Sequence, residues 1–150
     1  MLLLRGEMDT ATARHSVSVA GVITDDDGRA LLVRRRDTLR WEPPGGVLEL
    51  DESIEAGLRR EVREETGLTV EPVALTGVYK NMSRGIVALV FRCNVLSGHL
   101  RLNDEVSRFQ WATLAEVKAL ADEAFAIRVL DALADRPVPA VRHHDGIRIV

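Results

Sequence analysis

Apolar residues in the first third of the chain recur in the short runs that β-strands produce. The segment Ser16–Ile23 consists mainly of Val, Ala and Ile, and a second apolar run extends over Ala30–Arg36. Between them, Asp25–Gly28 has the aspartate and glycine content of a turn. This pattern predicts two strands joined as a hairpin.

A helical period replaces the strand pattern after Pro43–Gly46, whose prolines and glycines interrupt regular structure. Ile54, Leu58 and Val62 stand four residues apart, which is the spacing of one buried stripe on an α-helix. The pattern predicts a helix over Ser53–Thr66, and the glycine that follows is a common helix end.

The second half of the chain contains three further strand-like runs and then two helical segments. The runs are Leu68–Tyr79, Ile86–Leu96 and Arg108–Trp111, and the helices extend from a Thr113 cap to Leu120 and over Ala124–Ala134. Because Ile86–Leu96 is nearly all apolar, we expect it in the centre of a sheet. Ile127, Leu130 and Leu133 are expected to form the inward face of the second helix.

The chain is long enough for one globular domain with its own core, which we place at residues 14–135. Residues 1–13 are predicted to be a disordered tail. Residues 136–150 are predicted to be a C-terminal tail with a short strand over Ile147–Val150, in which His143 and His144 are expected to be exposed. Strands on both sides of an early helix, with more helix near the C-terminus, favour an α/β or α+β sandwich.

Charge and cysteine content argue against several classes of protein. The formal net charge is −3, so the chain has no broad basic field to hold a nucleic-acid polymer. The single cysteine, Cys93, can form neither an internal disulfide nor a cysteine metal cluster, which favours a reducing cytoplasm. The apolar start Met1–Leu4 is too short for a signal sequence or a membrane span, so no membrane is expected as a partner.

Carboxylates concentrate on one face of the predicted helix. Glu61, Glu64 and Glu65 stand at i, i+3 and i+4, so they project from the same side and repel one another. A cation among them would remove that repulsion, and oxygen ligands favour a hard ion such as Mg²⁺, Ca²⁺ or Mn²⁺. The alternative is a solvated helix face with exposed ion pairs, which is common for helices rich in Glu and Arg.

Residues near these acids have properties that would support such a site. Arg60 stands four residues before Glu64 and can hold that carboxylate in place. Gly57 lowers helix stability, which the close approach of another chain segment would explain. The pair Gly45 and Gly46 lets the backbone approach a ligand, and its carbonyls can add oxygen ligands.

The spacing of these residues is typical of one family. Gly46, then Glu52 after five residues, then Arg60–Leu68 after seven more resemble the box sequence of the Nudix hydrolase family at every specified position. The resemblance implies an α/β fold, the Nudix α/β/α sandwich with a mixed β-sheet, in which the box forms loop, helix and loop. Asp51 stands where the family usually has glycine, and this departure leaves every box position intact.

The resemblance also implies an activity, which is hydrolysis of the diphosphate linkage between a nucleoside diphosphate and another moiety. Glu61, Glu64 and Glu65 would bind Mg²⁺, for which Mn²⁺ is an expected substitute, and the Gly45 carbonyl would be a further ligand. The ion would lower the pKa of a water molecule, and a carboxylate of the cluster would accept its proton as the water attacks phosphorus.

Three more residues receive roles from the resemblance. Arg60 and Glu52 are expected to orient the helix and the loop rather than to act chemically. Glu105, in the loop Asn103–Glu105, resembles an additional catalytic glutamate that many Nudix enzymes carry on a loop facing the box helix. The alternative for Glu105 is a solvated loop acid.

Candidates for substrate binding come before the box. Arg34 and Arg36 share a strand face and could neutralise phosphate charge, although basic residues at a strand end are more often solvated. Trp41 could stack on a base, and its alternative is core packing. The expected partner is a small nucleotide-type substrate rather than polymeric nucleic acid, and a homodimer is left open.

Two other function classes compete with a hydrolase. A Nudix-fold nucleotide sensor would bind without cleavage, but such domains usually lose box acids, and all of them are present here. An acidic structural helix in an interaction protein does not account for the spacing. The sequence lacks the G-x-S-x-G and G-x-x-x-x-G-K-[ST] motifs, so serine hydrolysis and P-loop chemistry are not supported. The substrate and the leaving group stay open.

Overall fold

The computed structural model describes residues 12–150, so residues 1–11 of the predicted N-terminal tail lie outside the described part. The strands are β1 (Ser16–Ile23), β2 (Ala30–Arg35), β3 (Trp41–Glu42), β4 (Gly45–Val47), β5 (Leu68–Asn81), β6 (Ile86–Gly98), β7 (Val106–Ala112) and β8 (Ala140–His144). The helices are α2 (Ile54–Thr66), α3 (Leu114–Leu120) and α4 (Glu123–Leu133). The structure confirms every helix and strand predicted between residues 16 and 134 to within a few residues.

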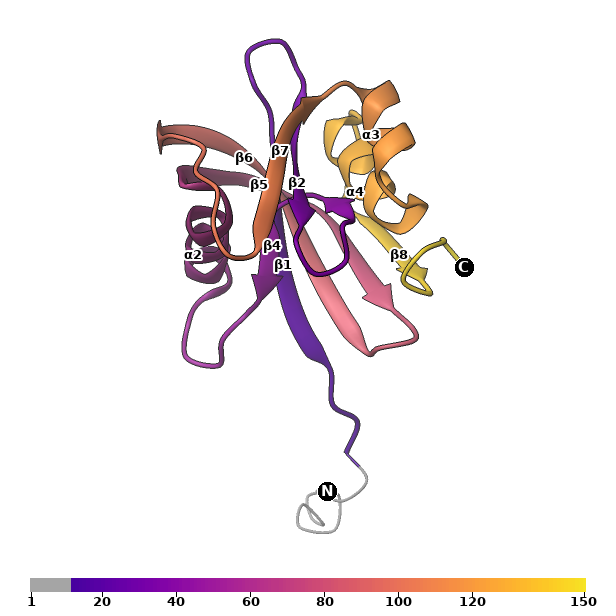
Figure 1. The fold of residues 1–150 in the computed structure, drawn as a ribbon. Helices are drawn as coiled ribbons and strands as arrows, with labels where there is room; N and C mark the ends of the chain where they lie inside the picture. The colour runs from indigo at the N-terminus through magenta and orange to yellow at the C-terminus, as the bar shows by residue number, and fades with distance from the viewer. Residues whose placement is uncertain (1–11) are drawn as a thin grey trace.

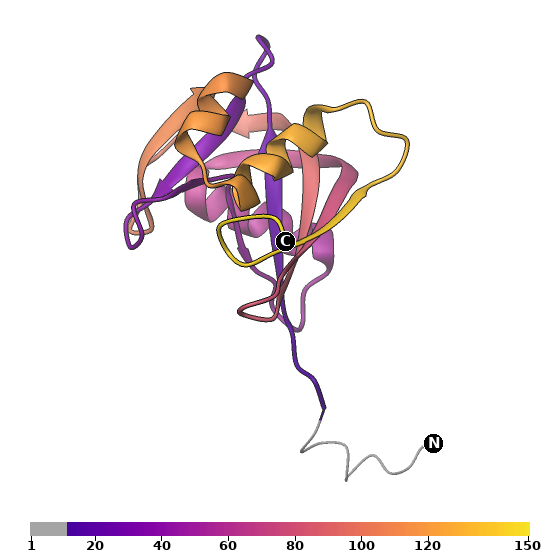
Figure 2. The same ribbon diagram turned by 90° about the vertical axis from the view of Figure 1, so that its right-hand side faces the viewer.

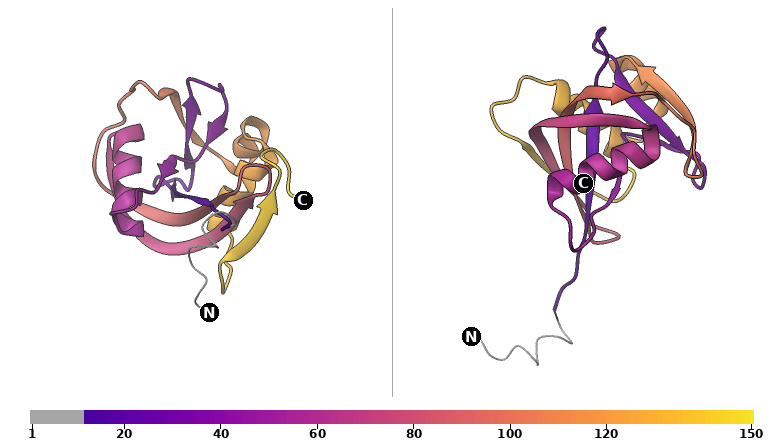
Figure 3. Two further views of the ribbon diagram at one scale, coloured as in Figure 1. Left: turned by 90° about the horizontal axis from the view of Figure 1, so that it is seen from below. Right: turned by 90° about the vertical axis from the view of Figure 1, so that its left-hand side faces the viewer.

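Two β-sheets lie between helices on opposite sides of the molecule (Figures 1 and 3). The larger sheet has the strand order β4-β1-β6-β5-β8 and is mixed, because β1 is parallel to β6 whereas β5 is antiparallel to it. The smaller sheet is antiparallel with the order β3-β2-β7. Helix α2 covers one side, and α3 and α4 cover the other. This arrangement confirms the predicted α/β/α sandwich with a mixed sheet.

Strand β6 is the apolar run that was predicted to lie centrally, and it lies in the middle of the larger sheet between β1 and β5. All of β1 pairs with it, from Ser16 opposite Ile86 to Ile23 opposite Cys93. Cys93 is therefore a buried free thiol, and burial raises its pKa to about 12.

The predicted hairpin of β1 and β2 is wrong. The two strands lie in different sheets, and one isolated bridge from Thr24 to Ala30 joins them. Strand β1 pairs instead with β6 along its whole length and with β4 over Ser18, Val19 and Ala20. The turn itself forms, because Asp25 Oδ1 accepts hydrogen bonds from the backbone N–H groups of Asp27 and Arg29 at 2.9 Å. This turn carries the chain from one sheet to the other.

The C-terminal segment also differs from its prediction. Residues 140–144 form β8, which pairs in parallel with β5, whereas Ile149 makes a single bridge to His144 (Figure 2). His144 is buried rather than exposed, because its ring lies against Arg128 and Phe125 of α4. The segment therefore completes the larger sheet instead of forming a loop.

Helix α2 begins and ends where its sequence directs. The Ser53 hydroxyl accepts a hydrogen bond from a backbone N–H of the first turn at 3.2 Å. Gly67 ends the helix in the left-handed conformation at φ 85°, where an added side chain would also meet the carbonyl of His99. Leu58 and Val62 are buried against the larger sheet. The acids Glu61, Glu64 and Glu65 therefore lie beside the face of the helix that Leu58 and Val62 occupy.

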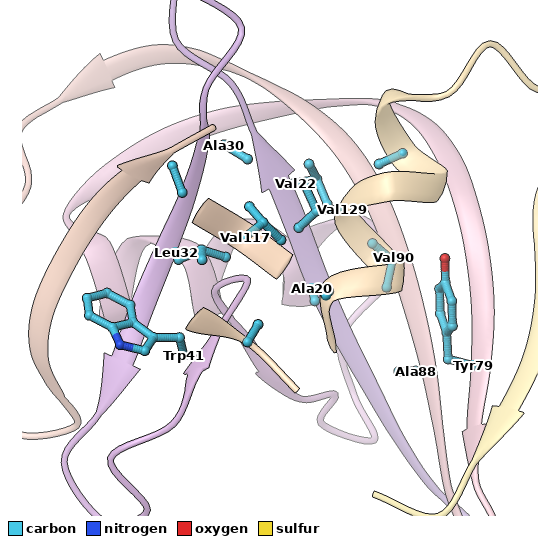
Figure 4. Packing of buried hydrophobic residues seen from close by; sticks show 14 residues of the cluster. Ala20, Val22, Ala30, Leu32, Trp41, Tyr79, Ala88, Val90, Val117 and Val129 are labelled. Atoms are coloured by element: carbon cyan, nitrogen blue, oxygen red, sulfur yellow. The ribbon is translucent and has the colours of Figure 1, made fainter. Parts of the chain in front are cut away.

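The apolar residues around Leu58 and Val62 form the first core of the protein. A second core lies between the two sheets and the helices α3 and α4 (Figure 4). Its labelled members are Ala20, Val22, Ala30, Leu32, Trp41, Tyr79, Ala88, Val90, Val117 and Val129. The predicted Thr113 cap of α3 is confirmed, because its side chain accepts a hydrogen bond from the backbone of the first turn.

The inward face of α4 is only partly as predicted. Ile127 and Leu133 pack against the second core while staying partly exposed, and Leu130 is half-buried. The fully enclosed positions include Arg128 and Asp131, which hydrophobic periodicity does not anticipate because both are charged. No helix within residues 12–150 is long and apolar enough to cross a membrane.

Candidate functional site

The acids of α2 lie against the glycine strand β4. Gly45 donates its backbone N–H to Oε1 of Glu65 at 2.8 Å. A side chain at Gly46 would collide with the carboxylate of Glu61, and one at Gly45 would collide with the backbone of β1. The two glycines therefore let β4 fit between β1 and the acids. A larger residue at Gly45 would push β4 away from β1, and one at Gly46 would push it away from Glu61.

Burial and neighbouring negative charge both act on Glu65, which is 1% exposed. Burial is the largest cause that raises the pKa of its carboxyl group, the Gly45 N–H lowers it, and the carboxylates of Glu42, Glu105 and Glu61 raise it, which together bring the pKa to about 8. A charged Glu65 is therefore unfavourable at this position unless a cation compensates for it.

Glu61 and Glu64 lie on the same face of α2 in more open surroundings. Burial is the main cause that raises the pKa of Glu61, Arg60 lowers it, and Glu64 and Glu105 raise it. The Glu64 side chain is 56% exposed and shares Arg60 with Glu61. The structure thus brings the three box acids and Glu105 into one cluster, with Glu65 at its enclosed end.

The loop before β7 carries Glu105 to this cluster. The Asn103 amide donates to the carbonyl of Glu65 at 2.7 Å, and its Oδ1 accepts from the N–H of Glu105 at 2.9 Å. The Arg36 backbone N–H donates to the Glu105 carbonyl at 2.8 Å. The Glu105 backbone is therefore attached both to the end of α2 and to the segment after β2.

Arg60 contacts acids of the box loop and of the helix. Two hydrogen bonds join it to Glu52, from Nη2 at 2.6 Å and from Nε at 2.9 Å. Its Nη1 donates to Glu61 at 2.9 Å and to Glu64 at 3.3 Å. The hydrogen bond from Arg60 lowers the pKa of Glu52 to about 2. Arg60 therefore holds the loop on the helix and balances part of the negative charge of the cluster.

The box loop packs closely on Gly57. The side chains of Leu48 and Glu52 occupy the space that a Cβ at Gly57 would take, which confirms that close approach of another segment explains this glycine. Oε1 of Glu52 also accepts the N–H of Glu49 at 2.9 Å. The loop thus has a defined position, set by Glu52 and by the missing side chain at Gly57.

Arg60→Ala is expected to lower both stability and activity. The acids that it contacts would repel one another without compensation, and the loop would lose its two bonds to the helix. We expect the melting temperature to fall by roughly 2–4 °C and kcat to fall by about tenfold. Circular dichroism melts beside steady-state rates measure both quantities.

Arg59→Ala is the matched control, because Arg59 lies on the same helix and pairs with Glu71 of β5 at 3.3 Å, away from the cluster. It should keep wild-type kcat. If Arg60→Ala keeps the wild-type melting temperature and loses only substrate affinity, Arg60 contacts the substrate and the positioning role is wrong.

The oxygen donors of the cluster fit a hard divalent ion. Within residues 12–150, no three acid, histidine or cysteine side chains converge on one point as they stand. Glu61 is turned to Arg60 and Glu65 to the Gly45 N–H. Each of these carboxylates has a second oxygen, and the more exposed Glu64 accepts longer hydrogen bonds from Arg60, at 3.3 and 3.4 Å. Carboxylates are preferred ligands of Mg²⁺, and such an ion would offset both the burial that chiefly raises the pKa of Glu61 and Glu65 and the repulsion from neighbouring acids.

The three candidates for substrate binding lie in different surroundings. Trp41 is 9% exposed within the second core, with the guanidinium carbon of Arg108 6.0 Å from its ring centre, which favours packing over base stacking. Arg36 lies beyond the end of β2, and its Nε donates to the carbonyl of Asn103 at 2.8 Å. Strand β2 ends at Arg35, so Arg34 lies in the strand and Arg36 in the turn after it, and the face that the two arginines were expected to share stays a prediction.

Sequence reasoning missed Arg35 and Glu42. Arg35 makes two bonds to Asp37, at 2.8 and 2.9 Å, and its Nη1 lies 3.5 Å from Glu42. Burial raises the pKa of Glu42, and Arg35 lowers it. The available signal was the position of Glu42 directly before the Pro-Pro-Gly-Gly segment, which places it beside the site together with β4.

The fold and the acid cluster define a class of protein, an α/β/α sandwich with an acidic helix packed on a glycine strand. The NUDIX domain model matches residues 14–133. The chain therefore belongs to the Nudix family.

Relatives agree with this placement. The "MutT-like protein" of Streptomyces ambofaciens is 53% identical over 100% of this chain and 98% of its own length. The "ADP-ribose pyrophosphatase" of Methanocaldococcus jannaschii is 30% identical over 71% of this chain and 66% of its own. A solved structure of a Nudix hydrolase from Nitrosomonas europaea has a TM-score of 0.73 and 30% identity, over 84% of this chain and 93% of that one.

Proposed function

We propose that this protein hydrolyses the diphosphate linkage of a nucleoside diphosphate joined to another moiety, with Mg²⁺ as cofactor and Mn²⁺ as a substitute. The observation that carries the proposal is the packing of the box acids on the glycine strand, where Glu65 accepts the Gly45 N–H at 2.8 Å and the Glu61 carboxylate fills the space beside Gly46. Membership in the Nudix family supports the same chemistry. A cytoplasmic location is part of this proposal, because the single cysteine is a buried free thiol.

Each residue has a role in the proposed reaction. Glu61, Glu64 and Glu65 would hold the ion, with the Gly45 carbonyl as a further ligand. When bound, a divalent ion would neutralise diphosphate charge and make water more acidic. Glu105 would accept a proton from the attacking water as the water oxygen bonds to phosphorus, and the bond from phosphorus to the leaving oxygen would break with its electron pair going to the leaving group.

Glu105 is the better proton acceptor on geometric grounds. Its loop reaches the cluster from outside the helix, so its carboxylate is not committed to Arg60 or to Gly45 as those of Glu61 and Glu65 are. The hydrogen bonds between Arg60 and Glu52 hold the box loop against α2. Arg34, Arg36 and Trp41 remain predictions for substrate binding.

A substrate panel with Mg²⁺ tests this proposal. The archaeal relative makes ADP-ribose the first compound to try, followed by nucleoside triphosphates, nucleotide sugars, dinucleoside polyphosphates and an oxidised nucleotide. Release of inorganic phosphate, pyrophosphate and nucleoside monophosphate is measured for each. We expect at least one compound to yield a nucleoside monophosphate. Binding of these compounds without hydrolysis of any would support a nucleotide sensor instead.

A further inference from the structure

The end of α2 presents carbonyl groups that the helix itself does not use. The last carbonyls of a helix have no partner N–H within it. The loop before β7 supplies two of the partners here. The Asn103 amide donates to the carbonyl of Glu65 at 2.7 Å, and the Arg101 backbone N–H donates to the carbonyl of Thr66 at 3.0 Å. This loop therefore docks on the last turn of the helix that carries the box acids.

The Asn103 side chain also shapes the loop that follows it. Its Oδ1 accepts the backbone N–H groups of Glu105 at 2.9 Å and of Val106 at 3.0 Å. In this pattern, a side-chain oxygen closes a turn two or three residues further along the chain. One half-buried amide therefore joins the backbone of Glu65 to the backbone of Glu105, since it donates to the first and accepts from the second.

An asparagine at position 103 satisfies both sides of this connection. Its Oδ1 faces two N–H groups, whereas its Nδ2 faces the carbonyl of Glu65 and, at 3.4 Å, the carbonyl of Arg101. An aspartate of the same shape would turn an acceptor toward those carbonyls, and a serine hydroxyl is too short to reach α2 from the turn. Either replacement keeps an acceptor for the turn and loses the connection to the helix.

The segment after β2 provides a second attachment for the loop. The Arg36 backbone N–H donates to the Glu105 carbonyl, and the Arg36 Nε donates to the Asn103 carbonyl, both at 2.8 Å. Both backbone polar groups of Glu105 are therefore bonded. Within residues 12–150, its exposed carboxylate makes no hydrogen bond or ion pair. A fixed backbone with an uncommitted carboxylate is what a positioned proton acceptor requires.

We propose that Asn103 is a positioning residue, whose amide sets the place of Glu105 relative to the box helix. This inference rests on the proposed function, because it takes Glu105 as the acceptor of the proton from the attacking water. Asn103 acts only through Glu105. Proton transfer needs hydrogen-bond reach, so a displacement of about an ångström lowers its rate strongly. Loss of the connection to α2 therefore slows the chemical step and leaves substrate affinity unchanged.

Steady-state kinetics at saturating Mg²⁺ test the inference on the compound that the substrate panel identifies. Asn103→Ser keeps an acceptor for the turn and loses the connection to α2. We expect kcat to fall by about fivefold while KM stays within about twofold of wild type. Asn103→Asp loses the same donor and should also lower kcat. Leu102→Ser is the matched control, because Leu102 lies in the same loop with a 55% exposed side chain, and it should keep wild-type kcat.

A double variant separates positioning from a general effect on the fold. Glu105→Gln removes the proton acceptor, so adding Asn103→Ser should leave kcat where Glu105→Gln alone places it. A residue that only stabilises the fold would multiply the two losses. Multiplied losses therefore overturn the inference. Wild-type kcat in Asn103→Ser or in Glu105→Gln overturns it as well.

Amide hydrogen exchange of the whole chain in EDTA follows the connection without catalysis. The informative group is the Arg101 N–H, because Asn103→Ser leaves its own acceptor on Thr66 in place. We expect it to exchange about fivefold faster in Asn103→Ser, the effect of one net hydrogen bond on local opening. Leu102→Ser should match wild type. Unchanged exchange in Asn103→Ser overturns the inference. If no compound of the panel is hydrolysed, the proposed function fails, and faster exchange still supports Asn103 as the residue that positions the Glu105 loop.

Discussion

Glu61→Gln and Glu65→Gln are each expected to lower kcat by about a hundredfold or more at saturating Mg²⁺. Each change removes one negative charge from the proposed ion site while nearly keeping the shape of the side chain. In EDTA, the melting temperature of Glu65→Gln should not fall, because the charge it loses is disfavoured by burial and by the neighbouring carboxylates. Rates and circular dichroism melts therefore distinguish lost chemistry from lost folding.

Glu55→Gln provides the control for these two variants. Glu55 lies in the first turn of the same helix and is exposed outside the cluster, so its loss should leave kcat near the wild-type value. Wild-type rates in both Glu61→Gln and Glu65→Gln would contradict the proposed site. An equal loss in Glu55→Gln would mean that the effect comes from the charge of the helix as a whole.

Glu105→Gln is expected to lower kcat by at least about tenfold, with a smaller effect on KM. The amide cannot accept the proton of the attacking water, whereas substrate contacts elsewhere are unchanged. Stability should stay the same or rise slightly, because Glu105 raises the pKa of both Glu61 and Glu65 and so repels them.

Asp104→Asn removes one charge from the neighbouring residue of the same loop and should retain nearly wild-type rates. The comparison is made at saturating Mg²⁺, so that a weaker hold on the ion does not imitate a lost proton acceptor. If both variants have equal rates near wild type, Glu105 is a solvated loop acid and the chemistry belongs to the box residues alone.

The features that the sequence predicts well are those that local interactions decide. The α2 boundaries follow from the Ser53 cap, the buried stripe of Leu58 and Val62, and the left-handed Gly67, all of which act within a few residues. The shared face of the box acids follows from helical geometry in the same way. The central position of β6 could be predicted because its apolar composition reflects burial on both faces.

The features that the sequence does not predict depend on partners far along the chain. The pairing of β1 with β6 and β4, which excludes the hairpin with β2, is decided by edges that local patterns do not specify. Strand β8 forms because β5 has an unpaired edge about sixty residues earlier. The ion pair of Arg35 with Glu42 depends on the pairing of β2 with the short strand β3, which no local pattern predicts. Arg128 of α4 and His144 of β8 are buried against each other, and this contact depends on how two separate elements pack.

The dependence of hydrolysis on a divalent ion tests the central claim most directly. Protein stripped with EDTA is assayed on the compound that the substrate panel identifies, before and after Mg²⁺ is restored. Carboxylates that hold a catalytic ion predict a loss of rate of about a hundredfold or more in EDTA and full recovery with Mg²⁺ or Mn²⁺. Undiminished hydrolysis in EDTA would contradict the assignment of Glu61, Glu64 and Glu65 as ligands of a catalytic ion.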